Sequence, residues 1–150
     1  MQVQTTRFGL IEVDNERVIQ FPKGVLGFPE VHDYVLLQTN EEGNFFWMQA
    51  AREPDLAFVV CDPALFVPGY EVPLKLDEFS AIGLDRREDA QIFVIVNKVD
   101  RTLTGNLQGP LVVNARNRQG MQLVLSEKKF NTRHPLIDLE ARQPAVARTA

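Results

Sequence analysis

The sequence Phe21-Pro22-Lys23-Gly24-Val25-Leu26-Gly27-Phe28 sets apolar residues between one proline and two glycines. Proline and glycine mark places where a backbone turns, so this segment predicts a tight turn between two core strands. Its Gly-x-x-Gly spacing is shared with the loop by which KH domains clamp a nucleic-acid backbone, but the central residues are the apolar Val25 and Leu26. The segment also lacks the Gly-Lys-Ser/Thr ending of a phosphate loop. A structural turn is therefore the preferred interpretation.

Short apolar runs bounded by turn residues recur along the chain, at 18–21, 34–37, 45–48, 56–61, 92–96, 111–113 and 121–125. Their lengths suit strands and are too short for most helices. The run 92–96 is apolar throughout, which predicts a strand buried on both faces. In 121–125 apolar and polar residues alternate, as in a strand with one buried face.

Turn residues at 14–16 and 117–120 indicate hairpin turns. Only 76–84 indicates a helix, of one or two turns, because Leu76, Phe79 and Ile82 follow a spacing of three. We expect an all-β, antiparallel, barrel-like or sandwich domain over residues 1–140. The composition of 141–150 predicts a disordered or loosely attached tail.

Length and composition predict one domain in a reducing compartment. A chain of 150 residues buries about 68–70% of its unfolded surface on folding, so it needs no disulfide or metal to hold a core. The single cysteine, Cys61, cannot form an internal disulfide. No run approaches the ~20 apolar residues of a membrane helix, and the N-terminus lacks the features of a signal peptide. We expect a cytoplasmic protein that does not bind membranes.

The net charge of −4 is unevenly distributed. Residues 1–100 carry 17 acidic and 8 basic side chains, and residues 101–150 carry 3 acidic and 8 basic ones. An acidic surface disfavours direct nucleic-acid binding, which depends on phosphate contacts. It favours a basic partner, although the two signs can equally pair within the fold and serve solubility.

No residue pattern points to catalysis, a metal or a cofactor. Cys61 ends an apolar run and precedes Asp62, whose charge raises a thiol pKa, so a structural cysteine is favoured. The two histidines, His32 and His134, do not combine with Cys61 in a zinc-site spacing. We expect a protein without enzymatic activity.

The order and spacing of several segments resemble the FliW family of flagellar assembly factors. The resemblance covers about residues 3–139 and includes the segments 8–13, 18–28, 34–37, 46–49, 56–63, 103–114 and 120–122. It implies that 8–13 and 18–21 form a short strand pair. The family often has an acidic residue directly after its Gly-Phe pair, whereas here Pro29 separates Phe28 from Glu30.

The resemblance implies two protein partners that bind in turn. One is flagellin before export, and the other is the carbon storage regulator CsrA, which represses translation of flagellin mRNA. When flagellin is scarce, the free protein sequesters CsrA; when flagellin accumulates, it occupies the protein and repression returns. Mutually exclusive binding makes this a switch by mass action.

The acidic residues of the segment 62–78 suggest where such partners bind. We place the contact surface at Phe28, Glu30, Asp62, Phe66, Tyr70, Glu71, Asp77 and Glu78. The run 66–70 is either an exposed apolar loop or part of the core.

Two other functions remain open at this point. A small β-barrel can bind a flavin or a similar ligand and act as an oxidoreductase. A barrel of the OB type binds nucleic acid, which the acidic balance disfavours.

Overall fold

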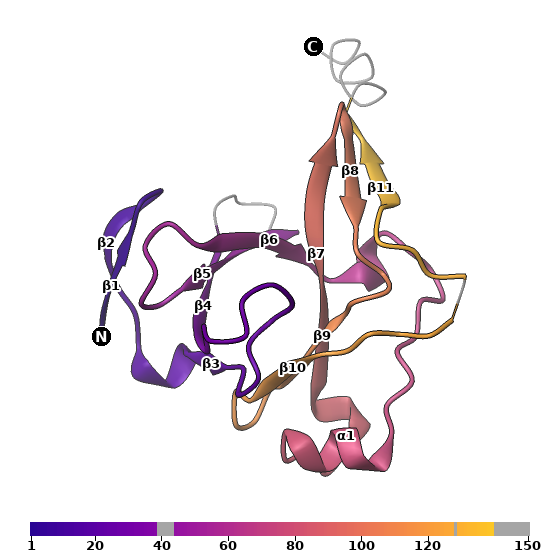
Figure 1. Cartoon of the computed structure of the whole chain (residues 1–150), viewed down its shortest axis with the longest axis horizontal. Helices are drawn as coiled ribbons and strands as arrows, with labels where there is room; N and C mark the ends of the chain where they lie inside the picture. The colour runs from indigo at the N-terminus through magenta and orange to yellow at the C-terminus, as the bar shows by residue number, and fades with distance from the viewer. Residues whose placement is uncertain (39–43, 128, 140–150) are drawn as a thin grey trace.

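The computed structural model describes residues 1–38, 44–127 and 129–139 (Figure 1). The predicted tail at 141–150 lies outside these residues. The strands are β1 (Gln2–Thr5), β2 (Gly9–Glu12), β3 (Ile19–Gln20), β4 (Asp33–Gln38), β5 (Phe45–Ala50), β6 (Ala57–Cys61), β7 (Ala90–Val99), β8 (Thr102–Gly105), β9 (Leu111–Asn114), β10 (Gly120–Gln122) and β11 (His134–Asp138). One α-helix, α1 (Leu76–Ala81), and three 3₁₀ turns, Asn15–Arg17, Pro63–Leu65 and Arg87–Asp89, complete the described part.

The main sheet is antiparallel and curls into a barrel-like shape. Its strand order is β10-β9-β7-β6-β5-β4-β3, and β8 and β11 extend it on one side of β7. The two end strands meet where the Gln20 amide donates to the Arg118 carbonyl at 2.9 Å and the Gln119 side chain donates to that of Gln20 at 3.0 Å. The expected all-β, barrel-like fold is confirmed.

Strand β7 connects two parts of the sheet, the barrel and a projecting arm. Its first half, from Ala90 to Phe93, pairs with β9, and its second half pairs with β8 in an arm that projects from the barrel (Figure 1). Phe93 faces the barrel interior, whereas Val94 packs in a separate cluster under the arm. The strand is thus buried on both faces along 92–96, as its continuous apolar sequence predicts.

The turn at 21–28 closes one mouth of the barrel. Figure 1 shows this loop at the centre of the curled sheet, between β3 and β10. Val25 is buried in the barrel core, and the Leu26 amide is held by the Gln122 side chain at 2.8 Å. Gly24 and Gly27 both have positive φ, which explains the two glycines of the motif. The sequence interpretation as a turn between core strands is correct.

The pairing of the N-terminal segment was wrongly predicted. Strand β2 pairs with β1 in a separate hairpin, and β3 pairs with β4 instead. Residues 14–16 do not form a hairpin turn, because the 3₁₀ turn Asn15–Arg17 carries the chain from one sheet to the other. The hairpin packs on the barrel through Val3, which is fully buried, and through the edge-on contact of Phe8 with Trp47.

The hairpin turn at 117–120 and the short helix are as predicted. Residues 117–120 join β9 to β10, and the buried Asn114 side chain donates to the carbonyls of Ile82 and Gly83 at 3.0 and 3.1 Å. These bonds fix the end of α1 on the hairpin. Strand β10 ends at Gln122, although Leu123 and Leu125 keep the predicted alternation and are buried.

Candidate functional site

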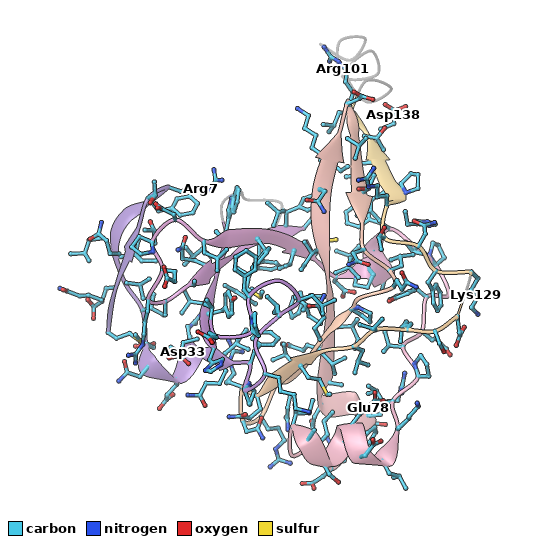
Figure 2. All side chains as sticks on the ribbon, viewed as in Figure 1. Arg7, Asp33, Glu78, Arg101, Lys129 and Asp138 are labelled. Carbon is cyan, nitrogen blue, oxygen red and sulfur yellow. The ribbon has the colours of Figure 1, made fainter. Side chains whose placement is uncertain are left out.

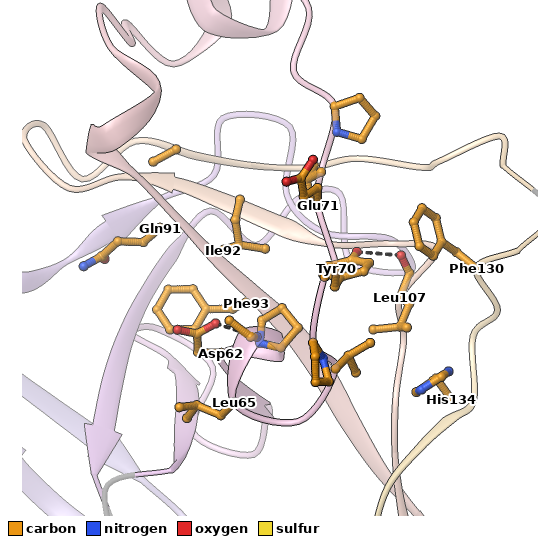
Figure 3. Close-up of a pocket in the computed structure, with 18 of the residues that line it drawn as sticks. Asp62, Leu65, Tyr70, Glu71, Gln91, Ile92, Phe93, Leu107, Phe130 and His134 are labelled. Carbon is orange, nitrogen blue, oxygen red and sulfur yellow. Dashed lines mark hydrogen bonds between the residues drawn. The ribbon is translucent and has the colours of Figure 1, made fainter.

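A groove of about 1200 Å³ lies beside the first half of β7, next to the loop that follows β6. It is bordered by the loop after β6, by the first half of β7 and by the segment between β10 and β11 (Figure 3). The lining residues are Asn44, Phe46, Asp62, Pro63, Ala64, Leu65, Val67, Pro68, Gly69, Tyr70, Glu71, Val72, Pro73, Arg87, Ala90, Gln91, Ile92, Phe93, Leu107, Glu127, Lys129, Phe130 and His134.

The sequence Asp62-Pro63 creates the groove by ending β6. The Asp62 carboxylate accepts a hydrogen bond from the Ala64 amide at 2.9 Å, and proline occupies the first position of the 3₁₀ turn. Proline has no amide hydrogen to continue a ladder and favours the first turn of a helix. The chain therefore leaves the sheet at Asp62 and crosses over β7 as a loop.

Tyr70 anchors this loop to the body of the protein. Its hydroxyl donates to the Leu107 carbonyl at 2.7 Å, and its ring packs edge-on against Phe130 with centroids 5.1 Å apart (Figure 3). Burial raises the pKa of Tyr70 to about 12. Phe66 stacks on Phe45 at 5.4 Å. Neither interpretation of 66–70 holds in full: Phe66, Val67 and Tyr70 are half-buried, and Pro68 and Gly69 are exposed. Val67 and Tyr70 line the groove.

Two carboxylates of the groove, those of Asp62 and Glu71, form no ion pair within the described residues. Both side chains are exposed. Of the two basic side chains in the groove, Lys129 has its Nζ 3.4 Å from the Glu127 carboxylate, whereas Arg87 donates to the neutral Val72 carbonyl at 2.5 Å and keeps its charge. An approaching basic group would therefore find two available carboxylates.

The structure brings together only some of the predicted contact residues. Asp62, Tyr70 and Glu71 line the groove, and Phe66 supports its wall. Asp77 and Glu78 lie on α1, away from it; Figure 2 shows Glu78 well separated from Lys129 at the groove. The Glu78 carboxylate accepts from the Lys75 amide at 2.8 Å, so it caps the helix.

Phe28 and Glu30 lie on a different surface. Phe28 contacts Phe58 edge-on at 5.6 Å, and Glu30 borders a small hollow of about 350 Å³ with Asp33, Arg52 and others. The sequence interpretation missed the first half of β7 and Phe130 as groove residues. The Asp62-Pro63 pair was the available signal, because it marks where β6 must separate from β7.

The candidate catalytic and metal-binding residues do not converge. Cys61 is fully buried, and burial followed by the charge of Asp62 raises its pKa to about 12. Among the residues that the structure describes, no three His, Cys, Asp or Glu side chains are grouped as a metal site. No helix of the described part has the length and apolar character needed to cross a bilayer.

Comparisons with known proteins identify the family. The family model described as "FliW protein" matches residues 2–136. The chain belongs to the FliW family. It is 37% identical to the flagellar assembly factor FliW of Treponema denticola over 139 residues, which cover 91% of this chain and 94% of that protein. It is 36% identical to the Heliobacterium modesticaldum FliW over 147 residues, covering 97% and 96%.

A solved structure of this family confirms the fold. The crystal structure of a flagellar assembly factor FliW superposes with a TM-score of 0.83 at 31% identity, covering 91% of this chain and 97% of that chain. The resemblance inferred from the sequence motifs is therefore correct. The motifs at 22–28 and 103–114 have structural roles. Residues 22–28 form the loop that packs into the barrel core through Val25, and residues 103–114 form strands β8 and β9 and the loop between them.

Proposed function

We propose that this chain is a cytoplasmic flagellar assembly factor that binds flagellin and CsrA in mutually exclusive complexes. Free protein sequesters CsrA and relieves the repression of flagellin mRNA, whereas flagellin-bound protein does not. Membership of the FliW family supports the flagellar role. The observation that supports CsrA as a partner is the groove in which Asp62 and Glu71 lie without an ion-pair partner among the described residues.

The physical argument is complementarity of charge. A protein that binds RNA needs basic surface to contact phosphates, and such a surface is attracted to exposed carboxylates. The apolar wall formed by Val67, Tyr70 and Phe130 supplies area that excludes water around the charges. The groove thus combines the two features that protein interfaces use, an apolar centre and a charged rim.

The barrel interior offers little support for the flavin alternative. It is filled by side chains of one cluster, among them Phe21, Tyr34, Met48 and Phe93. A flavin would therefore have to bind outside this cluster. Protein binding is the better-supported function.

Charge reversal tests the groove assignment. In the double variant Asp62→Lys/Glu71→Lys we expect the affinity for CsrA to fall at least tenfold, since a tenfold change corresponds to about 1.4 kcal/mol and each reversal replaces attraction by repulsion. The matched control is Asp14→Lys/Glu16→Lys, which reverses two exposed carboxylates beside the 3₁₀ turn after β2. Equal affinities of both variants for CsrA would remove the groove as the contact site.

A further inference from the structure

The groove borders an unpaired edge of the main sheet. Strands β6 and β7 pair only through Val59–Cys61 and Val94–Val96, and within the described residues no strand continues on this side along 90–93. The other edge of 90–93 is taken by β9. Ala90, Gln91, Ile92 and Phe93 all line the groove. Since their side chains alternate between the two faces, a hollow lined by four consecutive residues lies against the edge of the strand.

The direction of the backbone groups along β7 follows from two hydrogen bonds. The carbonyl of Asp89 accepts from the Ala115 amide at 2.8 Å, and that of Ile95 accepts from the Asn106 amide at 2.9 Å. Both carbonyls therefore point to the side of β8 and β9. The N–H and C=O of a strand residue point to the same side and alternate along the chain. The N–H and C=O of Ile92 consequently point to the other side, into the groove.

The residue that the register places opposite Ile92 cannot pair with it. Cys61 is the partner of Val94, so a continued ladder would place Pro63 opposite Ile92. Proline has no amide hydrogen, and the Pro63 carbonyl already accepts from the amides of Phe66 and Val67 at 3.1 and 2.8 Å. The same two residues, Asp62 and Pro63, thus open the groove and leave the backbone of Ile92 without a ladder partner.

We propose that the groove binds an extended segment of a protein partner as an added strand on β7, pairing with the backbone of Ile92. Addition of a strand to an exposed edge is a recurring mode of peptide recognition, in which main-chain bonds supply affinity and side-chain pockets supply specificity. The available carboxylates of Asp62 and Glu71 favour a segment with a lysine or arginine beside its paired residues. The inference deepens the proposed function and rests on it only for the identity of the partner.

A synthetic peptide tests the surface without either proposed partner. The probe is an acetylated and amidated hexapeptide of alternating valine and threonine with lysine at both ends. At a peptide concentration equal to its dissociation constant, we expect hydrogen exchange of the Ile92 amide to slow about twofold, because half of the molecules are then occupied. The Phe93 amide, which points to β9, is the internal control and should keep its exchange rate.

Two further comparisons separate strand addition from ordinary groove binding. The same hexapeptide with its four central amide nitrogens methylated cannot pair, and its affinity should fall at least tenfold. Ala64→Trp fills the groove and should also reduce peptide affinity at least tenfold, whereas Ala81→Trp, at an exposed position on α1, should leave it unchanged. Equal binding of the methylated peptide, unchanged Ile92 exchange at saturation, or absence of binding at millimolar peptide would overturn the inference. Failure of CsrA or flagellin to bind would contradict only the proposed function.

Discussion

Replacing Gly24 by alanine tests how tightly the 21–28 loop is packed, through the change in the free energy of unfolding. Gly24 and Gly9 have nearly the same φ, +67° and +69°, but differ in the space around them. A Cβ on Gly24 would lie 2.6 Å from the Pro29 Cα and even closer to the Phe28 carbonyl oxygen, whereas a Cβ on Gly9 would meet nothing within 4 Å. The two variants therefore share a conformational cost and differ in a steric one.

The magnitudes can be worked out for each variant. A left-handed conformation costs a residue with a Cβ about 1–2 kcal/mol, and the stiffer unfolded chain returns about 0.4–1 kcal/mol. Gly9→Ala should therefore lose about 1 kcal/mol or less. In Gly24→Ala the neighbours of the new Cβ are backbone atoms that cannot rotate away, which adds about 1–3 kcal/mol of overpacking. Its total loss should be about 2–4 kcal/mol, out of a typical stability of about 5–15 kcal/mol.

Urea unfolding of both variants, followed by circular dichroism, is the assay. The midpoint of Gly24→Ala should fall well below that of Gly9→Ala with unchanged m-values, and its melting temperature should fall by about 4–16 °C at about 2–4 °C per kcal/mol. Equal destabilisation of the two variants would refute the argument that the loop is packed against its own backbone at Gly24.

Three further predictions concern buried polar groups. Gln49→Leu should destabilise the protein by about 2–3 kcal/mol in urea unfolding, because the two N–H groups of the Gln49 amide are shared among four backbone carbonyl oxygens at 3.1–3.2 Å around the loop between β5 and β6. Full stability would contradict this role. Tyr70→Phe should cost about 1 kcal/mol in the same assay through loss of the bond to Leu107, and a loss below about 0.3 kcal/mol would show that the bond does not hold the loop. Burial raises the pKa of Cys61 from 9.0 to about 12, so above pH 9 the folded state retains a proton that the unfolded state releases. The free energy of unfolding should therefore fall above pH 9, by up to about 1.4 kcal/mol per pH unit. In Cys61→Ala it should fall less steeply. Parallel pH profiles of the two proteins would contradict the shift.

The sequence was sufficient for the fold class because the strand signals are local. The continuous apolar run 92–96 and the turn residues at 117–120 specify a doubly buried strand and a hairpin without reference to distant residues. The N-terminal pairing was wrong because 8–13 and 18–21 are equally good strands, and the tertiary contacts of the β1–β2 hairpin, such as that of Phe8 with Trp47, cannot be read from local sequence. β11 went unpredicted because it contains Pro135 and gains its stability from pairing with β8, which is distant in sequence.

The candidate site was predictable only in part for a similar reason. Asp62, Tyr70 and Glu71 are close in sequence and line one groove along a single loop, and their role in partner binding stays a prediction. Glu78 follows closely in sequence, but α1 carries it away and uses its carboxylate as a cap. The unpaired edge at Ile92 depends on where β6 separates from β7, which requires the register of the two strands.

A competition titration tests the proposed partner switch most directly. Purified protein is titrated by calorimetry with CsrA from the same organism, first alone and then with flagellin bound in advance, at two salt concentrations. The proposal predicts binding of CsrA to the free protein, weaker binding at higher salt because exposed charges are screened, and loss of binding when flagellin is present. Undiminished binding of CsrA to the flagellin complex, or no binding to the free protein, would contradict it.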